Sequence, residues 1–314
     1  MRLYFIINPK AGLGAFQKLV HKAAARLTKQ GYEVRRIETK KPGDAIELAR
    51  QAAAEGYDIA VAVGGDGTIN EVCNGLAGTD TALGVLPAGT ANVYAADMRI
   101  PIWGPLHPEA VKKGTEILTM GQRRRVDLGR VQLPDGESRY FLMWCGIGLD
   151  AAISQARPPT SNRSLGYASW LVSGLMVTFD FMGTSAMIVT DSTTLRERVL
   201  VAVASNGQLY GRIWRMAPEA KMDDGLLDVA VMSGHRWPST FKHVIGLTLK
   251  KHVRDPDFHL HRTKWLYLSA KENLPVHVDG DTIGTTPVTV ETVPLGLNII
   301  VPNNAPKRLF KNGR

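Results

Sequence analysis

Residues 64–68 place three glycines beside a carboxylate and a hydroxyl, Gly64-Gly65-Asp66-Gly67-Thr68, directly after the apolar run 59–63. Glycines at a strand-to-helix turn let the backbone approach a ligand closely, and the free N–H groups at a helix start bind phosphate. The Asp66 carboxylate would repel a phosphate unless a cation bridges them, and Mg²⁺ is the usual bridge in phosphoryl transfer. The turn therefore indicates a phosphate site with a metal. The alternative is a plain glycine turn in which Asp66 or Thr68 caps a helix that begins at about Ile69.

Three other polar loops follow apolar runs in the same half of the chain. Asn8-Pro9-Lys10-Ala11-Gly12 closes the first run, Thr39 lies just beyond the second, and Pro87-Ala88-Gly89-Thr90 follows the run after the glycine turn. Each of these loops alone is an ordinary turn. Because the carboxyl ends of parallel strands share one edge of a sheet, we expect all of them to lie beside the glycine turn.

The elements that must position these loops alternate between strand and helix. The pattern predicts strands at 3–7, 33–37, 59–63 and 83–86, and helices at 16–30 and 45–55. Leu19, Ala23 and Leu27 recur on one face of the first helix, as expected of an amphipathic helix. This alternation predicts an α/β domain over residues 1–125, doubly wound and Rossmann-like.

The pattern changes after residue 125 to short apolar runs separated by turns. Strands are predicted at 126–131, 140–144, 186–189, 199–204, 226–232, 265–269, 275–278, 288–291 and 297–301, and helices at 165–181 and 239–251. Such a series predicts a mostly antiparallel β-sandwich domain over residues 126–302. We expect the basic tail 303–314 to pack back on the first domain or to fray.

Composition limits the class of protein and its partners. The 314 residues are 44% hydrophobic and 21% charged, with a net charge of +9 and only two cysteines, Cys73 and Cys145. The proportions predict a globular protein, and the few cysteines with no signal peptide at the start favour a reducing cytoplasm. The apolar stretch 165–182 is interrupted by polar residues and falls short of a membrane span. The positive charge favours acidic partners, namely nucleotide phosphates, anionic lipid headgroups or nucleic acid.

Several motifs together resemble one known family. Residues 64–71 (Gly-Gly-Asp-Gly-Thr-Ile-Asn-Glu) and 86–92 (Leu-Pro-Ala-Gly-Thr-Ala-Asn) are similar to the diacylglycerol kinase catalytic family, which includes bacterial lipid kinases, sphingosine kinases and ceramide kinases. The resemblance continues through residues 206–207, 210–211 and 217–228, and it ends at 278–281 with 286–288. The family fold, a nucleotide-binding α/β domain followed by a β-sandwich, agrees with the pattern of elements.

The resemblance implies a role for each part of the site. It implies that ATP is held by residues of the first domain: Asn8, Thr39, Gly65, Asp66, Gly67, Thr68, Asn70, Glu71 and Thr90. Asp66 would also position Mg²⁺ near the transferred phosphoryl group, and a second metal would be bound by the Asp224 side chain and the Lys221 and Leu226 carbonyls. The alternative for that segment is an Asp-Gly turn between strands.

Phosphoryl transfer to an alcohol needs a base, because the acceptor hydroxyl has a very high pKa. The family places this base, usually a glutamate, directly after an Asp-Gly pair. That position is Asp281 here, and the alternative is a simple hairpin turn over residues 279–281.

The chain departs from the family pattern elsewhere too. Val93 stands where family members commonly carry Asp, and the polar network expected there could still include Asp127. The bulky trio Arg212-Ile213-Trp214 replaces glycines and is expected either to narrow the acceptor cleft, to contact an interface or to form a surface turn.

These observations predict a cytoplasmic, peripherally membrane-acting lipid kinase that uses ATP and Mg²⁺. The alternatives are a NAD kinase-like enzyme and a non-catalytic lipid-binding protein that retains the fold. Nucleic-acid binding rests on net charge alone and is not expected, and a homodimer is left open.

His259 and His261 could bind a metal from one face of a strand, although no third ligand is evident and a solvated pair is favoured. Cys73 is expected in the core.

Overall fold

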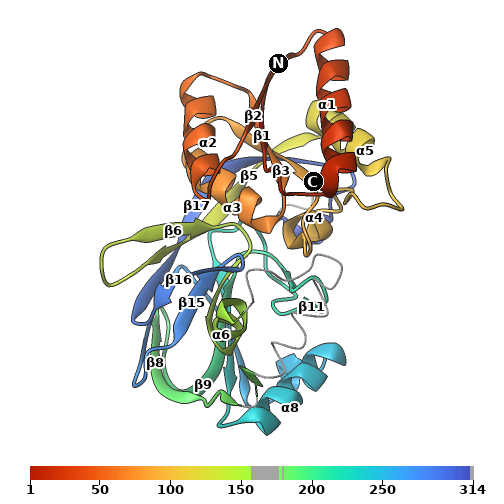
Figure 1. Ribbon diagram of the computed structural model, residues 1–314. Helices are drawn as coiled ribbons and strands as arrows, with labels where there is room; N and C mark the ends of the chain where they lie inside the picture. The colour runs from red at the N-terminus through yellow and green to blue at the C-terminus, as the bar shows by residue number, and fades with distance from the viewer. Residues whose placement is uncertain (157–176, 179, 312–314) are drawn as a thin grey trace. The chain divides into compact units, whose positions relative to one another are not determined.

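The computed structural model describes residues 1–156, 177–178 and 180–311, and these form two compact units (Figure 1). The first unit comprises Met1–Leu128 and Pro294–Arg314, and the second comprises Gly129–Val293. Both boundaries fall inside strands, β5 (Gln122–Gln132) and β17 (Val288–Val301). The chain therefore passes between the units twice, and each unit is described by itself.

The first unit is built on a parallel sheet with the strand order β4-β3-β1-β2. Its strands are β1 (Arg2–Ile7), β2 (Glu33–Glu38), β3 (Ile59–Gly64) and β4 (Ala82–Pro87). The carboxyl-terminal part of β17 joins in parallel beside β4, where Asn298 pairs with Ala82. Every residue of β3 and β4 is buried, as expected of central parallel strands covered on both faces.

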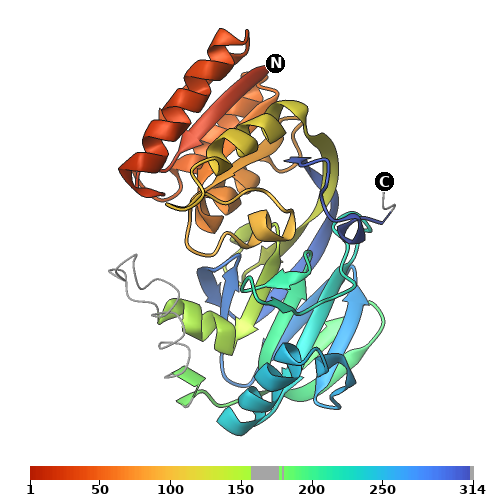
Figure 2. The same cartoon turned by 90° about the vertical axis from the view of Figure 1, so that its right-hand side faces the viewer.

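Helices cover both faces of this sheet, so the predicted doubly wound α/β fold is confirmed. The helices are α1 (Leu13–Lys29), α2 (Asp44–Ala54), α3 (Asp66–Leu76), α4 (Val93–Asp97) and α5 (Ala110–Met120). Helices α1 and α5 pack together on one face and α2 and α3 on the other (Figure 1, Figure 2). The predicted face of α1 is the packed one, since Leu27 is buried and Leu19 and Ala23 lie against the same core.

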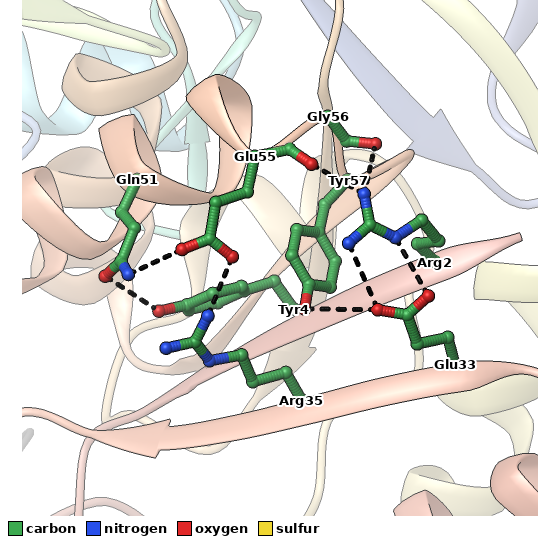
Figure 3. Close-up of polar contacts among 8 residues, drawn as sticks. All are labelled: Arg2, Tyr4, Glu33, Arg35, Gln51, Glu55, Gly56 and Tyr57. Carbon is green, nitrogen blue, oxygen red and sulfur yellow. Dashed lines mark hydrogen bonds and ion pairs between the residues drawn. The ribbon is translucent and has the colours of Figure 1, made fainter.

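A polar cluster ties the amino ends of the strands together, at the edge opposite the predicted ligand loops (Figure 3). Arg2 binds the Glu33 carboxylate with Nε–Oε2 at 2.9 Å and donates from Nη1 to the Glu55 carbonyl at 2.5 Å. Arg35 binds the Glu55 carboxylate at 2.7 Å, and the Arg2 guanidinium also lies 4.3 Å from the Tyr57 ring centre. These contacts join β1 and β2 to the turn that follows α2.

The cluster predicts a pH-dependent stability. The hydrogen bond from Arg2 lowers the pKa of Glu33, and hydrogen bonds from Gln51 and Arg35 lower the pKa of Glu55. A carboxyl group with a lowered pKa in the folded state stabilises the fold above its ordinary pKa, and this contribution is lost as the pH falls through the folded-state pKa.

We therefore expect Glu33→Gln to lower Tm slightly at pH 7, and this difference from wild type should shrink as the pH falls through the lowered pKa of Glu33. Thermal unfolding monitored by circular dichroism across this range measures the difference. The matched control is Glu116→Gln, an exposed glutamate with no ion pair among the described residues. A difference between wild type and Glu33→Gln that persists unchanged into acid would contradict the assignment.

The second unit is a largely antiparallel β-sandwich, as predicted. Its strands are β6 (Ser138–Phe141), β7 (Trp144–Gly148), β8 (Thr184–Thr190), β9 (Thr194–Ser205), β12 (Leu227–Ser233), β13 (Phe258–Thr263), β14 (Trp265–Ala270), β15 (Pro275–Val278) and β16 (Asp281–Thr285), with the adjoining parts of β5 and β17. They run in the order β16-β15-β7-β9-β8-β14-β17, and β12 pairs with both β9 and β13. One apolar core draws residues from nearly all of these strands, including Phe141, Ala202, Val229 and Val276.

Shorter elements complete this unit: helices α6 (Leu149–Gln155) and α8 (Trp237–Thr248), and a small hairpin of β10 (Leu209–Tyr210) and β11 (Trp214–Arg215). The predicted helix at 165–181 lies almost entirely outside the described residues. No helix within the described ranges is both long enough and apolar enough to cross a bilayer.

Two strand predictions were wrong in detail. Residues 140–144 do not form one strand, because the backbone between β6 and β7 leaves the ladder and is bound by a side chain from another hairpin. Residues 288–291 and 297–301 belong to one long strand, in which Leu295 adopts a left-handed conformation with φ 49°. The intervening residues 292–296 therefore bend the strand without ending it.

Candidate active site

The predicted ligand loops of the first unit do gather at one edge of the sheet. The amide of Asn8 donates to the Val63 carbonyl and that of Thr39 to the Ile7 carbonyl, each at 2.9 Å. The Ala88 amide likewise donates to the Gly64 carbonyl at 2.9 Å. Each loop thus extends the parallel ladder by one bond at the carboxyl ends of the strands, as the sequence predicts.

The glycine turn brings two of these loops into backbone contact. A Cβ atom on Gly89 would lie 2.5 Å from the Gly65 Cα atom, and one on Gly64 would lie 2.5 Å from the Thr68 Oγ1 atom. Glycine is therefore required here by close approach. The prediction that the helix begins at about Ile69 was wrong, because α3 begins at Asp66 with Gly65 as its N-cap. Asp66, Gly67 and Thr68 form the first helical turn, whose N–H groups have no intrahelical partner.

The Asn8 side chain links its loop to this turn. Its Nδ2 donates to Thr68 Oγ1 at 3.2 Å, and its Oδ1 accepts from the Lys10 amide at 2.9 Å. Gln17 of α1 supports the loop from below by donating to the Asn8 and Ala11 carbonyls. The first loop and the helix start are thus fixed to each other before any ligand binds, which lowers the cost of ordering them.

The Asp66 carboxylate binds the start of α4. Its Oδ1 accepts from the Val93 amide at 2.8 Å. Asn92, buried and left-handed at φ 49°, exchanges two hydrogen bonds with Gly89, at 2.8 Å and 2.6 Å. The Val93 side chain is 4% exposed and so belongs to the core, and Thr90 on the same loop is exposed. The position where the family commonly has a carboxylate therefore has an apolar group here.

Two of the residues predicted to bind the nucleotide make structural contacts within the first unit. The Glu71 carboxylate accepts from the Gly43 amide at 3.0 Å and the Ala45 amide at 3.2 Å, and so caps α2, whose own N-cap is a glycine. Asn70 is 1% exposed and accepts from Asn74 on the next turn of α3. These contacts place both side chains in the scaffold beneath the glycine turn, and any contact with a nucleotide stays a prediction.

In the second unit, Asp281 follows a tight hairpin. Asp279 and Gly280 link β15 to β16 with φ values of 48° and 95°, the left-handed pair of a two-residue turn. The Asp279 carboxylate accepts three amides of the β6–β7 loop, from Leu142, Met143 and Trp144, at 2.8, 2.9 and 3.0 Å. A hairpin turn at residues 279–281 and a base at Asp281 are thus compatible, because the turn fixes the backbone at Asp281.

Asp281 is the first residue of β16, and its side chain is 48% exposed. Its Oδ2 lies 3.8 Å from Arg139 Nη2 on β6, at the outer limit of an ion pair. The carboxylate is therefore open to solvent beside a tight turn, and its use as a base stays a prediction.

A buried polar network that the sequence reasoning missed lies behind this turn. His277 Nε2 is 2.9 Å from Asp150 Oδ2, and Tyr210 donates its hydroxyl to the same oxygen at 2.8 Å. The Gly280 amide donates to His277 Nδ1 at 3.1 Å, so Nδ1 is unprotonated and Nε2 donates to Asp150. Burial and the Asp150 carboxylate raise the pKa of Tyr210 well above its ordinary value.

The sequence offered one signal for this network. A Cβ atom on Gly146 would lie 2.0 Å from Asp150 Oδ2 and 2.3 Å from His277 Nε2. The first glycine of the fragment Gly146-Ile147-Gly148 therefore allows close packing against a polar pair at the β7–α6 junction.

The segment predicted to bind a second metal contains an unusual charge arrangement. Asp224 accepts from the Leu226 amide at 3.1 Å and forms an ion pair with Arg262. Asp228 is 1% exposed, neither of its oxygens has a hydrogen bond from the described residues, and Arg262 Nε lies 3.6 Å from Oδ1. Burial raises the pKa of the Asp228 carboxyl group to about 6, which the Arg262 charge opposes. Two carboxylates thus share one guanidinium, and this local excess of negative charge would fit an added cation.

Side chains alone do not form a metal centre in the described ranges. No three His, Cys, Asp or Glu residues of those ranges come together in a way that could hold an ion. His259 and His261 do lie on one strand, β13, with ring centres 6.4 Å apart, and Cys73 is buried as expected.

Asp127 is buried and accepts from the Leu295 amide at 2.7 Å, so it anchors the bend of β17.

Comparison with known proteins covers nearly the whole chain. Residues 2–131 match the diacylglycerol kinase catalytic domain, and residues 144–301 match the YegS C-terminal NAD kinase beta sandwich-like domain. A diacylglycerol kinase of Bacillus subtilis is 25% identical over 311 residues, covering 98% of this chain and 99% of the relative. A diacylglycerol kinase of Staphylococcus aureus is 26% identical over 308 residues, covering 96% and 93%. The crystal structure of a diacylglycerol kinase from Bacillus anthracis, 21% identical, has a TM-score of 0.71 and covers 97% of this chain and 98% of that one.

Proposed function

Because this chain belongs to the diacylglycerol kinase family, we propose that it transfers the γ-phosphoryl group of ATP to the hydroxyl group of a lipid such as diacylglycerol. The observation that carries this proposal is the backbone contact of Gly65 with Gly89, with Asp66 opening helix α3 beside it. This arrangement supplies the N–H groups of a helix start and close backbone approach for phosphates, together with a carboxylate for a cation.

In this proposal the first unit binds ATP through the Asn8 loop, Thr39, the first turn of α3 and Thr90. Asp66 is only half-buried and also holds the Val93 amide, so its carboxylate is suited to bind Mg²⁺ as well as to position α4. Bound Mg²⁺ would neutralise charge on the transferred phosphoryl group. A second Mg²⁺ would be held by Asp224 with the Lys221 and Leu226 carbonyls and would offset the excess charge beside Asp228.

The acceptor chemistry is assigned to the second unit. Asp281 is the proposed general base, which takes the proton of the lipid hydroxyl as the phosphoryl group arrives. Such an enzyme would act in phospholipid biosynthesis on the cytoplasmic face of the inner membrane, bound peripherally, because its acceptor resides in the bilayer. Whether it acts as a homodimer is a separate question, which sedimentation of the active protein answers.

Radiolabelled ATP with Mg²⁺ and a panel of acceptors tests the proposal. The panel comprises diacylglycerol, a sphingoid base, ceramide, phosphatidylglycerol and NAD, and we expect label in a lipid. The second candidate is a NAD kinase-like enzyme, because residues 144–301 match a domain that is named as NAD kinase-like. Label in NAD would support that candidate, and label in no lipid under any condition would overturn the lipid kinase proposal and favour a non-catalytic lipid-binding protein.

The buried network predicts a positioning role for His277. His277→Leu removes the acceptor for the Gly280 amide and the donor to Asp150, so the turn before Asp281 loses its support. We expect kcat to fall about tenfold or more with KM for ATP unchanged, since misplacement of a base affects the chemical step.

The matched control is Tyr210→Phe, which removes one hydrogen bond to Asp150 and leaves the bond between His277 and Gly280 intact. We expect the control to lose less of its kcat than His277→Leu. Equal losses in the two variants, or a change in KM for ATP alone, would contradict the positioning role.

A further inference from the structure

Helix α8 exposes much of its apolar surface. Trp237, Phe241, Ile245 and Leu249 follow one another at four-residue intervals, with exposed fractions of 44%, 37%, 56% and 59%. Residues at this spacing lie on one face of a helix, which continues to its C-cap residue Leu249. The buried residues of α8 are His243 and Leu247, whose positions fall on a different side. The helix is amphipathic, but one of its apolar faces is directed to solvent.

The exposed apolar side chains of this protein are concentrated here. Thirteen large hydrophobic residues of the described ranges are exposed, and six of them lie between residues 237 and 253. Scattered exposed hydrophobic residues need no explanation, whereas a contiguous group of this kind marks an interaction surface. Val244 and the 52%-exposed Val253 complete the group.

The small β10–β11 hairpin borders the same face. Trp214 Nε1 donates to Thr248 Oγ1 at 3.2 Å, and Thr248 lies on the face of α8 that carries Phe241 and Val244. Ile213 at the tip of this hairpin is 55% exposed, and Arg212 and Arg215 beside it are exposed as well. The trio Arg212-Ile213-Trp214 thus forms an edge of the α8 surface.

The charged side chains of residues 234–254 are all basic. Residues 234–254 contain no Asp or Glu, and they contain five Lys or Arg residues. Lys242 is paired with Asp255 and Asp257, at 2.7 Å and 2.6 Å. The other four, Arg236, Lys250, Lys251 and Arg254, are exposed, and none has a carboxylate within ion-pair distance in the described part of the chain.

We propose that α8 and residues 249–254, with the β10–β11 hairpin, form a docking surface for an anionic lipid bilayer. An apolar face bordered by cations is what an interfacial helix presents to a membrane, with its apolar side chains below the headgroups and its cations among them. A second copy of the chain would bring the same cations against one another, which disfavours self-association through this face. This surface deepens the proposed function, because the acceptor would lie in such a bilayer, but its test requires no turnover.

Co-sedimentation with phosphatidylcholine vesicles, with and without phosphatidylglycerol, tests the surface. We expect wild-type protein to bind the anionic vesicles and the variant Ile245→Glu/Leu249→Glu to bind at least about thirtyfold more weakly. The reason is that two apolar side chains that would enter the bilayer are replaced by carboxylates, which the anionic headgroups repel. The matched control is Leu106→Glu, which makes the same change at a side chain that is 88% exposed in the other unit. Wild-type protein that does not bind, or a double variant that binds normally, overturns the proposal.

The cations give an independent arm. Lys250→Gln/Lys251→Gln/Arg254→Gln should weaken binding about a hundredfold at low salt, with a smaller effect at high salt, where screening already removes the attraction. Both native cysteines are buried, so Ile245→Cys accepts an environment-sensitive fluorophore selectively, and its emission should shift to the blue on anionic vesicles. A blue shift produced by raised protein concentration without lipid would instead indicate a second copy and overturn the proposal, as would a shift seen only with an added protein partner.

Kinase assays separate this inference from the proposed function. With a short-chain diacylglycerol dispersed in detergent, the α8 variants should phosphorylate as fast as wild type, because no bilayer is needed. An inactive wild type that still binds vesicles through α8 would refute the kinase assignment and leave the docking surface standing. Circular dichroism and Tm of each variant show that the fold is intact.

Discussion

Replacing Asp66 by Asn should reduce phosphoryl transfer by at least about a thousandfold while leaving the fold intact. Electrostatic stabilisation by a metal and its carboxylate is the main source of rate in phosphoryl transfer, so loss of the negative charge removes it. An asparagine at this position keeps an oxygen that accepts the Val93 amide, the bond that Asp66 Oδ1 makes at 2.8 Å. The Asn variant therefore separates the charge from the structural contact.

Asp66→Ala removes both the negative charge and the hydrogen bond with the Val93 amide. This variant should be as inactive as Asp66→Asn and less stable than it. Turnover of labelled ATP and Tm are measured for the two variants together. Asp44→Asn is the matched control, since Asp44 is also the first residue of a helix after a glycine and accepts two backbone amides, from Lys40 and Lys41. We expect the control to keep most of its activity. An Asp66→Asn enzyme with normal turnover would mean that the carboxylate serves only to hold Val93.

Asp281→Asn should lower kcat by about 10²–10⁴-fold, the usual contribution of a general base, with ATP still bound. The side chain is exposed and its ion pair with Arg139 is long, at 3.8 Å, so the substitution should cost little stability. Asp281→Glu should restore a large part of the activity lost in Asp281→Asn, because the family usually has a glutamate at this position and the hairpin fixes only the backbone.

Steady-state kinetics with a fluorescent or labelled nucleotide separates binding from chemistry for these variants. Glu272→Gln, at another exposed carboxylate of the same unit, serves as the control and should leave kcat unchanged. If Asp281→Asn turns over normally, another group takes the proton and Asp281 is only the first residue of a strand.

The architecture was predictable because its signals are local. Buried strands of the first unit read as continuous apolar runs, each followed by a turn and an amphipathic helix, and this order alone fixes a parallel sheet. Predicted and observed bounds of α2 and of β1 to β4 differ by one residue or less at each end. The helix after the glycine turn was placed three residues late, because glycines are poor helix formers and disguise a first helical turn.

The side-chain contacts of the site were less accessible to the sequence. Asp279 binds amides more than 130 positions earlier in the chain, and Asp150 meets His277 across 127 positions. Neither pairing has a local pattern, since only the antiparallel neighbours β7 and β15 bring the residues together. The glycine turn supplied the candidate at Asp66, the family resemblance supplied the one at Asp281, and the structure supplied the contacts that hold them.

The first unit also sets a rule for dissecting the protein. A fragment that stops at residue 128 would lack residues 294–301, which pair with β4 and fix it through the bond between the Gly78 amide and the Gly296 carbonyl. The wholly apolar β4 would then become an open sheet edge, a template for aggregation. A nucleotide-binding module that expresses well should therefore be spliced, with the last segment rejoined to residue 128 through a short linker or by circular permutation.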